Sequence, residues 1–315
     1  MSASDLPGKP HPLEWSHGRG EVWPLGAALH HLQLNLDSRV IRPLAEAPWH
    51  EDSGITADRS IPAHLRHLGG EWPCVPFGKS AADPIVHGYG TDNLWRLLRA
   101  EASSSTWEVI YPADRPVERL RREVSGIHGH PAVNLDLTVT ARRDCQLAIG
   151  LHPILRLPDA GKELRVEGAY SHVLTFPAVF EPGVSRLAAG LRVTDISSLP
   201  LADGGTSSLS ELCQAGTEEA FQLFGVDGTL RLVYPLAGYA VRLEWDPVAF
   251  PTCLFWLSGG GRKQRPWNGQ FKGLGVEPLD ARFVARDGVG AIDGGRSFRA
   301  GEIWSTRYRI SVERA

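Results

Sequence analysis

The chain has 315 residues, of which 42% are hydrophobic and 22% are charged, and its formal net charge at pH 7 is −3. These values are ordinary for a globular protein with a large core, and they give no sign of a nucleic-acid or anionic-membrane partner. The four cysteines are scattered and form no Cys-x-x-Cys pair, so they predict neither a zinc site nor a disulfide framework.

The N-terminal segment contains three prolines within its first 12 residues, where a signal peptide would need an apolar run. We expect residues 1–20 to form a flexible arm and residues 21–315 to form a single β domain. The longest apolar run, 248–257, contains a proline and is shorter than the about 20 residues that a transmembrane helix needs. We therefore expect a cytoplasmic protein with no membrane partner.

Further along the chain the dominant pattern is alternation of apolar and polar residues, which is typical of half-buried strands. This alternation covers residues 133–140, 146–152, 230–234, 241–245 and 304–312. The turn residues Pro235 and Gly238 stand between two of these segments and predict a hairpin. Short helical patterns occupy 94–100 and 218–224. The sequence predicts an all-β, mostly antiparallel domain with few short helices.

Two of the predicted strands end in a polar side chain beside residues with little or no side chain. In Gly-Leu-Gly-Val-Glu-Pro at 273–278, Glu277 shares a strand face with Gly275. In the segment 146–152, His152 shares a face with Gly150 and Ala148. A carboxylate and an imidazole with room for a ligand indicate a general acid/base pair, and they favour a carbohydrate-active enzyme.

These strand ends belong to a longer series of short motifs. The series is Glu-Trp-Pro-Cys-Val-Pro-Phe-Gly at 71–78, His-Gly-Tyr at 87–89, Trp95, His-Pro at 152–153 and Gly-Val-Glu-Pro at 275–278. In this order and at these separations, the motifs resemble those of the aldose 1-epimerase (galactose mutarotase-like) family. The resemblance extends over nearly the whole chain. It implies a galactose mutarotase-like β-supersandwich.

The resemblance also implies an activity and the residues that carry it. The protein would be an isomerase that interconverts the α and β anomers of a monosaccharide or sugar phosphate, with no cofactor and no metal. Glu277 matches the general base, His152 the general acid, and His87 a histidine that contacts the sugar near its ring oxygen. The base would remove the proton of the anomeric hydroxyl while the acid protonates the ring oxygen, so the hemiacetal opens and can close as the other anomer. Such catalysis is typically worth about 10²–10⁴-fold in rate.

The chain departs from the family pattern after the Pro-Phe pair. Family members often carry Asn-Arg there, whereas this chain has Gly-Lys-Ser at 78–80. Lysine offers a point charge where arginine offers a two-pronged fork. Because a basic loop also begins at Arg262, we expect Lys79 and Arg262 to contact an anionic group of the substrate. We further expect three tryptophans to line the sugar cleft, namely Trp95, Trp256 and Trp267.

Two other classes of function stay open at this point. The first is a catalytically silent carbohydrate-binding protein on the same fold, in which Glu277 and His152 only hold hydroxyl groups. The second is a metal-dependent cupin-like enzyme, because His128 and His130 share one strand face. The chain contains no Gly-x-Ser-x-Gly nucleophile elbow and no Gly-x-Gly-x-x-Gly fingerprint. The oligomeric state is not predicted by any of these patterns.

Overall fold

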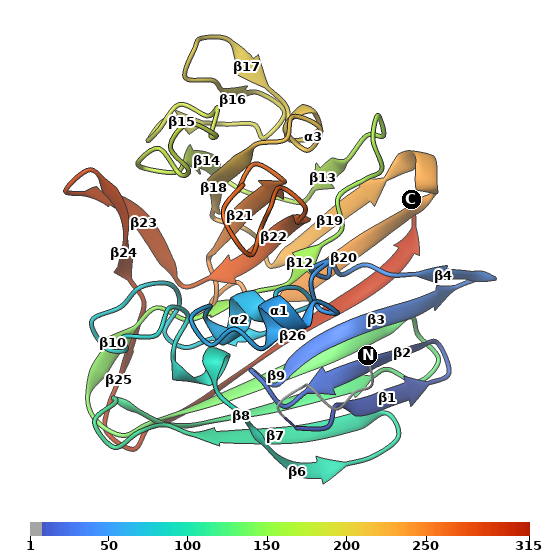
Figure 1. Ribbon diagram of the computed structural model, residues 1–315, viewed down its shortest axis with the longest axis vertical. Coiled ribbons are helices and arrows are strands. Elements are labelled where there is room, and N and C mark those ends of the chain that lie inside the picture. Colours follow the sequence, from blue (N-terminus) through green and yellow to red (C-terminus); the bar gives the residue numbers. More distant parts are fainter. Residues whose placement is uncertain (1–7) are drawn as a thin grey trace.

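The computed structural model describes residues 8–315. Within them the chain consists mainly of antiparallel strands, and its three α-helices are four residues long each (Figure 1). This confirms the prediction of a mostly antiparallel all-β chain with few short helices. None of these helices is long and apolar enough to cross a membrane.

One large sheet, here called the back sheet, has eight strands in the order β13-β19-β20-β26-β9-β8-β7-β6. Its strands are β6 (Arg96–Ala100), β7 (Ser104–Ile110), β8 (Val117–Gly126), β9 (Ala132–Ala141), β13 (Arg165–Glu167), β19 (Thr229–Tyr234), β20 (Tyr239–Trp245) and β26 (Ile303–Arg314). Tyr234 pairs with Tyr239 across a turn that ends at Gly238, in the left-handed conformation, which confirms the predicted hairpin.

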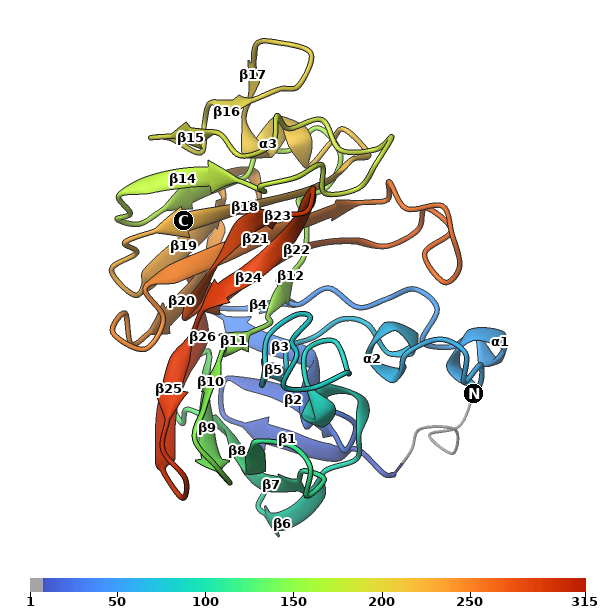
Figure 2. The ribbon, with the colours of Figure 1, turned by 90° about the vertical axis from the view of Figure 1, so that its left-hand side faces the viewer.

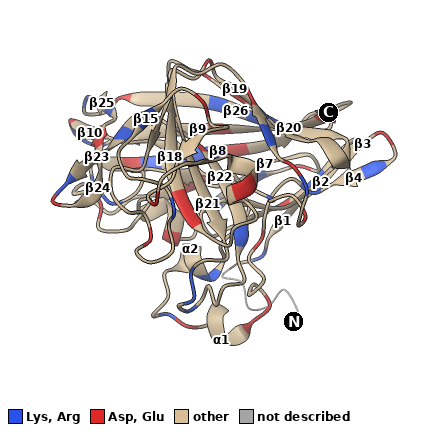
Figure 3. Ribbon diagram, turned by 90° about the horizontal axis from the view of Figure 1, so that it is seen from above, with Lys and Arg blue, Asp and Glu red and all other residues tan. Residues whose placement is uncertain are grey.

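The back sheet shows how alternation fixes the two faces of a strand. In β26, Tyr308 and Ile310 are buried in the main core, while Arg307 and Arg309 point outward. The Arg307 guanidinium pairs with Asp136 of the neighbouring β9 at 2.7 Å. Figure 3 shows basic and acidic residues interspersed over the strands.

The second large sheet, here called the site sheet, also has eight strands. They run in the order β15-β14-β18-β21-β22-β11-β5, and β12 pairs with β22 as well. Its strands are β5 (Pro73–Cys74), β11 (Gly150–Leu151), β12 (Ile154–Leu155), β14 (His172–Thr175), β15 (Arg192–Val193), β18 (Glu218–Phe224), β21 (Thr252–Gly259) and β22 (Lys272–Leu279).

The central strands of the site sheet are buried on both faces. Phe221 of β18 and Phe255 of β21 lie in the main core, whereas Ala220 and Trp256 lie in a second apolar cluster on the opposite face. The helical pattern at 218–224 was therefore misleading, because a strand without a solvent face lacks simple alternation. The prediction of a helix at 94–100 is also wrong, since Arg96–Ala100 forms the strand β6.

The remaining strands form smaller sheets. A four-stranded sheet has the order β1-β2-β3-β4, and three pairs join β10 to β25, β16 to β17, and β23 to β24. Their bounds are β1 (His11–Trp15), β2 (Gly18–Trp23), β3 (Ala28–Leu36), β4 (Arg39–Ile41), β10 (Cys145–Leu147), β16 (Leu199–Pro200), β17 (Thr206–Ser207), β23 (Ala281–Arg286), β24 (Val289–Gly294) and β25 (Arg296–Phe298).

The strand β1 corrects the expectation of a flexible arm over residues 1–20. From residue 11 onward this segment is paired with β2, and the side chains of Leu13 and Trp15 are buried in the main core. The alternation of these two residues with polar neighbours explains why the segment joins a sheet. Residues 1–7 of the expected arm lie outside the described residues.

A segment of residues 47–68, here called the cap, carries two of the helices. The helices of the chain are α1 (Ser53–Thr56), α2 (Ala63–Arg66) and α3 (Leu209–Leu212), together with the 3₁₀ turns η1 (Tyr89–Asp92) and η2 (Pro235–Ala237). Trp49 and Leu68 of the cap are buried in the second apolar cluster. Figure 2 shows α1 and α2 on the same side of the molecule as the loop between β21 and β22. In that loop Trp267 contacts Trp49, with ring centroids 5.7 Å apart.

Candidate functional site

Glu277 lies in β22, on the face of the site sheet that carries the second apolar cluster. In the pairing of β21 with β22, Trp256 is opposite Gly275 and Leu254 is opposite Glu277. A Cβ atom added to Gly275 would lie only 2.1 Å from the Glu277 Oε1 atom. Gly275 therefore leaves the space that the carboxylate occupies, as the alternation of the sequence predicted.

His152 directly follows β11, which pairs with both β22 and β5. Its backbone N–H donates a hydrogen bond to the Trp72 carbonyl at 2.9 Å. Its imidazole stacks on the Trp72 indole, with ring centroids 4.3 Å apart and an interplanar angle of 14°. This position places His152 Nε2 3.5 Å from Glu277 Oε1.

His87 joins this pair from a loop ahead of η1. Its φ of 66° is unusual for a residue with a side chain, and Gly88 follows with a φ of 85°. The Gly78 N–H donates to His87 Nδ1 at 3.2 Å, so the neutral His87 ring carries its proton on Nε2. The ring centroid of His87 lies 5.1 Å from that of His152. The structure thus brings together Glu277, His152 and His87 from three distant parts of the chain.

Glu277 and His152 are enclosed and His87 is half-buried, which differs from the expectation that these residues border a sugar cleft with room for a ligand. Glu277 is only 1% exposed and His152 is 5% exposed. Besides Trp72, the rings of Phe77 and Trp256 lie near His152, with centroids 6.3 and 5.8 Å away. The reason is that the aromatic rings of the second apolar cluster surround the two residues. These rings come from several segments of the chain, so sequence alternation could not predict that they lie together.

Several buried polar atoms of the site have no hydrogen-bond partner among the described residues. They are His152 Nδ1, Glu277 Oε1 and Trp72 Nε1. Buried polar atoms in folded proteins are nearly always hydrogen-bonded, so these unpaired atoms need an explanation. Together they offer acceptors and a donor suited to the hydroxyl groups of a polar ligand.

Burial also sets the protonation of the site. Desolvation raises the pKa of Glu277 well above its ordinary value, and it lowers the pKa of His152 to about 3. The pKa of His87 is lowered well below its ordinary value, chiefly by burial and further by the nearby His152. Burial thus favours the neutral form of both partners, which is the protonated carboxyl of Glu277 and the uncharged imidazole of His152. Such a pair can pass a proton in either direction.

A fourth histidine beside the site was not anticipated from the sequence. His64 of α2 pairs through Nδ1 with Asp92 Oδ1 at 2.6 Å, and its ring centroid lies 6.0 Å from that of His87. Asp92 also accepts a hydrogen bond from the His64 backbone N–H at 2.8 Å. No motif connects His64 to His87, so only the folded cap brings them together.

The other predicted binding residues have different surroundings. Trp256 and Trp267 lie in the second apolar cluster, and the Arg262 guanidinium lies 4.7 Å from the Trp267 ring centroid. Trp95 is instead buried in the main core, where its Nε1–H donates to the Gly90 carbonyl at 2.8 Å. The expectation that Trp95 lines the cleft is therefore corrected, because its indole is directed into the core. Lys79 is exposed in the loop that follows Phe77.

The alternative metal site at His128 and His130 does not form. Both histidines are exposed on the turn between β8 and β9. Within residues 8–315, neither of them belongs to a set of three His, Cys, Asp or Glu donors close enough to hold an ion. The shared strand face expected from their spacing is missing because the chain turns at this point.

Comparison with known proteins shows which fold the chain shares with solved structures. No protein-family model and no curated protein match the chain. Solved structures do match it. A protein from Escherichia coli K12, provisionally named an aldose 1-epimerase, has a TM-score of 0.66 at 15% identity, covering 98% of this chain and 99% of its own.

Two further structures agree with this result. A galactose mutarotase-like protein from Lactobacillus casei has a TM-score of 0.64 at 18% identity, with 96% of this chain and 100% of its own covered. A GalM/aldose epimerase homologue from C. elegans has a TM-score of 0.58 at 12% identity, with 97% and 99% covered. The resemblance seen in the short motifs is thus confirmed at the level of structure, and the chain has the galactose mutarotase-like fold.

Proposed function

We propose that this protein is an isomerase of the aldose 1-epimerase type, which interconverts the α and β anomers of a monosaccharide or sugar phosphate. The observation that carries the proposal is the pair of Glu277 and His152. Their side chains are buried, lie 3.5 Å apart and retain unpaired polar atoms beside aromatic rings. Aromatic surfaces and converging hydrogen-bonding groups are what a sugar ring needs for binding in one register.

In this proposal Glu277 is the general base and His152 the general acid. A sugar hydroxyl that donates a hydrogen bond to the carboxylate favours its ionised form and lowers the pKa of Glu277. The proton shared by the pair then resides on His152, from which it can pass to the ring oxygen. Glu277 takes the proton of the anomeric hydroxyl in the same step. The C1–O5 bond breaks, the free aldehyde forms, and closure after rotation about C1–C2 returns both protons.

The remaining histidine has a role that fits its tautomer. Because His87 Nδ1 accepts a hydrogen bond from Gly78, its Nε2–H is the group available to a ligand. It would donate to a sugar oxygen near the ring, as the family resemblance implies. Its low pKa keeps the ring neutral, so it would serve as a positioning donor and would not exchange protons during the reaction.

Sugar access requires movement, since the pair is enclosed. The cap and the loop between β21 and β22 meet over the site through Trp49 and Trp267. The polar links between them come from one exposed side chain: Arg265 pairs with Asp58 at 3.2 Å and donates to the Gly54 carbonyl, and such surface contacts contribute little to stability. We propose that separation of these two segments admits the sugar.

The choice between a neutral sugar and a sugar phosphate depends on two basic residues. Arg262 is already paired, since its Nε lies 2.7 Å from Glu181 and its Nη1 lies 3.8 Å from Glu218. Its charge is therefore largely neutralised. Lys79 is exposed and is the residue that we propose for contact with an anionic group. If the substrate is a phosphate, Lys79→Ala should weaken its apparent affinity without changing the exchange of the neutral sugar.

The test is anomer exchange, measured by NMR for glucose, galactose and their 6-phosphates at low and high salt. The wild-type protein should accelerate exchange of at least one sugar above the spontaneous rate. Glu277→Gln keeps the shape of the side chain and removes the proton acceptor, so it should lower the exchange rate by about 10²-fold or more. Binding of a sugar without any acceleration would instead identify a silent carbohydrate-binding protein.

A further inference from the structure

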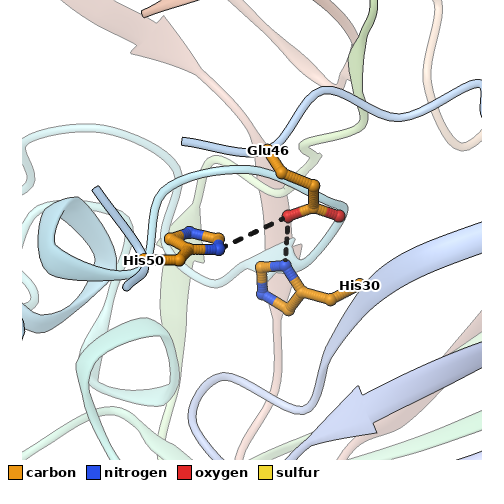
Figure 4. Close-up of side chains that lie close together, drawn as sticks. All are labelled: His30, Glu46 and His50. Carbon is orange, nitrogen blue, oxygen red and sulfur yellow. Dashed lines mark hydrogen bonds and ion pairs between the residues drawn. The ribbon is translucent and has the colours of Figure 1, made fainter. Parts of the chain in front are cut away.

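A second cluster of polar side chains lies where the cap begins, on the side of β3. It consists of His30 in β3, Glu46 just ahead of the cap and His50 within the cap (Figure 4). His30 Nδ1 lies 2.7 Å and His50 Nδ1 lies 3.9 Å from Glu46 Oε2. All three donor atoms lie within 4.8 Å of one another, and no other set of three such residues in 8–315 does so.

The tautomer of His50 is fixed by its surroundings. His50 Nε2 lies 2.8 Å from the Leu68 carbonyl oxygen, which can only accept, so Nε2 carries the proton. His50 Nδ1 is then unprotonated and carries a lone pair, and this atom is buried with no hydrogen-bond partner. This lone pair faces a carboxylate oxygen of Glu46. Two acceptors directed at each other repel, and a cation between them would turn this repulsion into attraction.

This arrangement has the features of a metal-binding histidine. Metal-bound imidazoles commonly donate their other N–H to a carbonyl or carboxylate, as His50 does to Leu68. His30 can present Nδ1 to an ion once its proton has moved to Nε2 of the same ring.

The surroundings provide both a support and an entry path. The Trp23 ring packs against His30 at 4.1 Å and against His50 at 5.4 Å between centroids, which restricts both imidazoles. A surface groove of about 640 Å³ reaches Glu46 and His31 from the other side. His31 Nδ1 lies 4.0 Å from Glu46 Oε1 and is 45% exposed, so it or a water can provide a fourth ligand.

We propose that His30, Glu46 and His50 bind a divalent transition-metal ion of the zinc class. Two imidazole nitrogens and one carboxylate oxygen are ligands that zinc accepts in proteins, with bond lengths of about 2.0–2.2 Å. To reach such distances the donor atoms need to move by about 1 Å. The site differs from the earlier His128 and His130 alternative, and it departs from the expectation that the protein holds no metal.

The position of the ion would give it a structural role. Glu46 and His50 flank the beginning of the cap, and Leu68, which holds His50, ends it. His30 belongs to β3, outside the cap. The ion would therefore fasten the cap to the four-stranded sheet. The proposal does not depend on the activity of Glu277 and His152, since it concerns a separate set of residues.

The experiment uses the full chain without a histidine tag, stripped with a chelator and then titrated with Co²⁺ and with Zn²⁺. Co²⁺ is followed by its visible absorbance, and Zn²⁺ by competition with a chromophoric chelator. We expect one ion per chain, an increase in the melting temperature with Zn²⁺, and slower proteolysis of the cap. Binding by nitrogen and oxygen should give no thiolate charge-transfer band, which separates this site from binding at the partly exposed Cys145.

Matched variants then locate the ion. Glu46→Gln and His50→Gln should each weaken binding by about 100-fold or more, whereas His128→Gln should leave it unchanged. The absence of stoichiometric binding by the folded wild-type protein would overturn the proposal. So would wild-type affinity in both site variants, or a thiolate band in the Co²⁺ spectrum. If one variant does not fold, the titrations of the wild-type protein and of the other variant still test whether the ion binds at this site.

Discussion

Gly275 and Glu277 lie on the same face of β22, and they show how one missing side chain shapes the candidate site. A Cβ at position 275 would meet the Glu277 carboxylate at 2.1 Å, and the carboxylate is the mobile end of its side chain. Gly275→Ala should therefore displace the carboxylate at little cost in stability. We expect anomer exchange to fall by about 10²-fold while the melting temperature changes little.

The control for this prediction is a double variant. If Gly275→Ala acts only through the carboxylate, adding it to Glu277→Gln should slow exchange no further, because the two changes remove the same interaction. An additive loss would show that Gly275 affects the site by another route.

The buried charges of the site also predict how stability depends on pH. The raised pKa of Glu277 means that the native carboxyl keeps a proton that the unfolded chain loses above about pH 4.5. The unfolded state then binds fewer protons, so the free energy of unfolding falls as the pH rises. His152 has the opposite effect between its native pKa of about 3 and its ordinary value of 6.5. The two slopes oppose each other between about pH 4.5 and 6.5, and only that of Glu277 remains above this range.

Removing the carboxyl should expose this dependence. Relative to the wild-type protein, Glu277→Gln should gain up to about 1.4 kcal/mol in free energy of unfolding for each pH unit above about 4.5, until the native pKa of Glu277 is reached. Urea unfolding of both proteins from about pH 5 to about pH 8 measures the difference. Parallel curves of free energy against pH would contradict the buried, protonated Glu277.

Among the elements, half-buried strands could be predicted and doubly buried ones could not. The alternation in 133–140 and 304–312 leads directly to β9 and β26, because one face of each is covered and the other is solvated. The segment 218–224 has apolar neighbours on both faces, so its pattern resembles a short helix. The local setting of Glu277 followed from Gly275 alone. Its enclosure did not, because the cap helices are four residues long and leave no periodic signal.

The cap provides a prediction for a single element. Trp49 is 2% exposed, and its ring packs on Trp267 and Phe271 with centroids 5.7 and 5.9 Å away. Trp49→Ala should remove this contact and lower the free energy of unfolding by about 3–5 kcal/mol. Denaturant unfolding measures the change. The control is Leu236→Ala, since Leu236 is 73% exposed and its loss should cost less than about 0.5 kcal/mol. Equal effects of the two variants would argue against the packing of the cap.

At the scale of the whole molecule, a buried ion pair connects the back sheet to the edge of the site sheet. Arg122 of β8 donates to Glu71, which precedes β5 and also pairs through its backbone with Leu29 of β3. Both charged side chains are almost fully buried, at 2% and 0% exposure. Arg122→Met should cost about 3–5 kcal/mol in stability, because it leaves Glu71 without its cation.

The double variant Arg122→Met with Glu71→Leu distinguishes charge from shape. It removes both charges, so it should recover most of the stability lost in Arg122→Met alone. Thermal and urea unfolding of the three proteins provide the comparison. If the double variant were less stable than Arg122→Met, the pair would contribute through packing and not through its charges.

The galactose mutarotase-like fold by itself does not determine an activity, since function depends on the residues of the site. The most direct test of ring opening by Glu277 and His152 is therefore a joint measurement of anomer exchange and sugar binding in wild-type protein, Glu277→Gln and His152→Gln. The expected result is exchange that falls by about 10²-fold or more in each variant, while calorimetric binding of the same sugar is retained. Exchange at the wild-type rate in both variants would contradict the assignment of this pair.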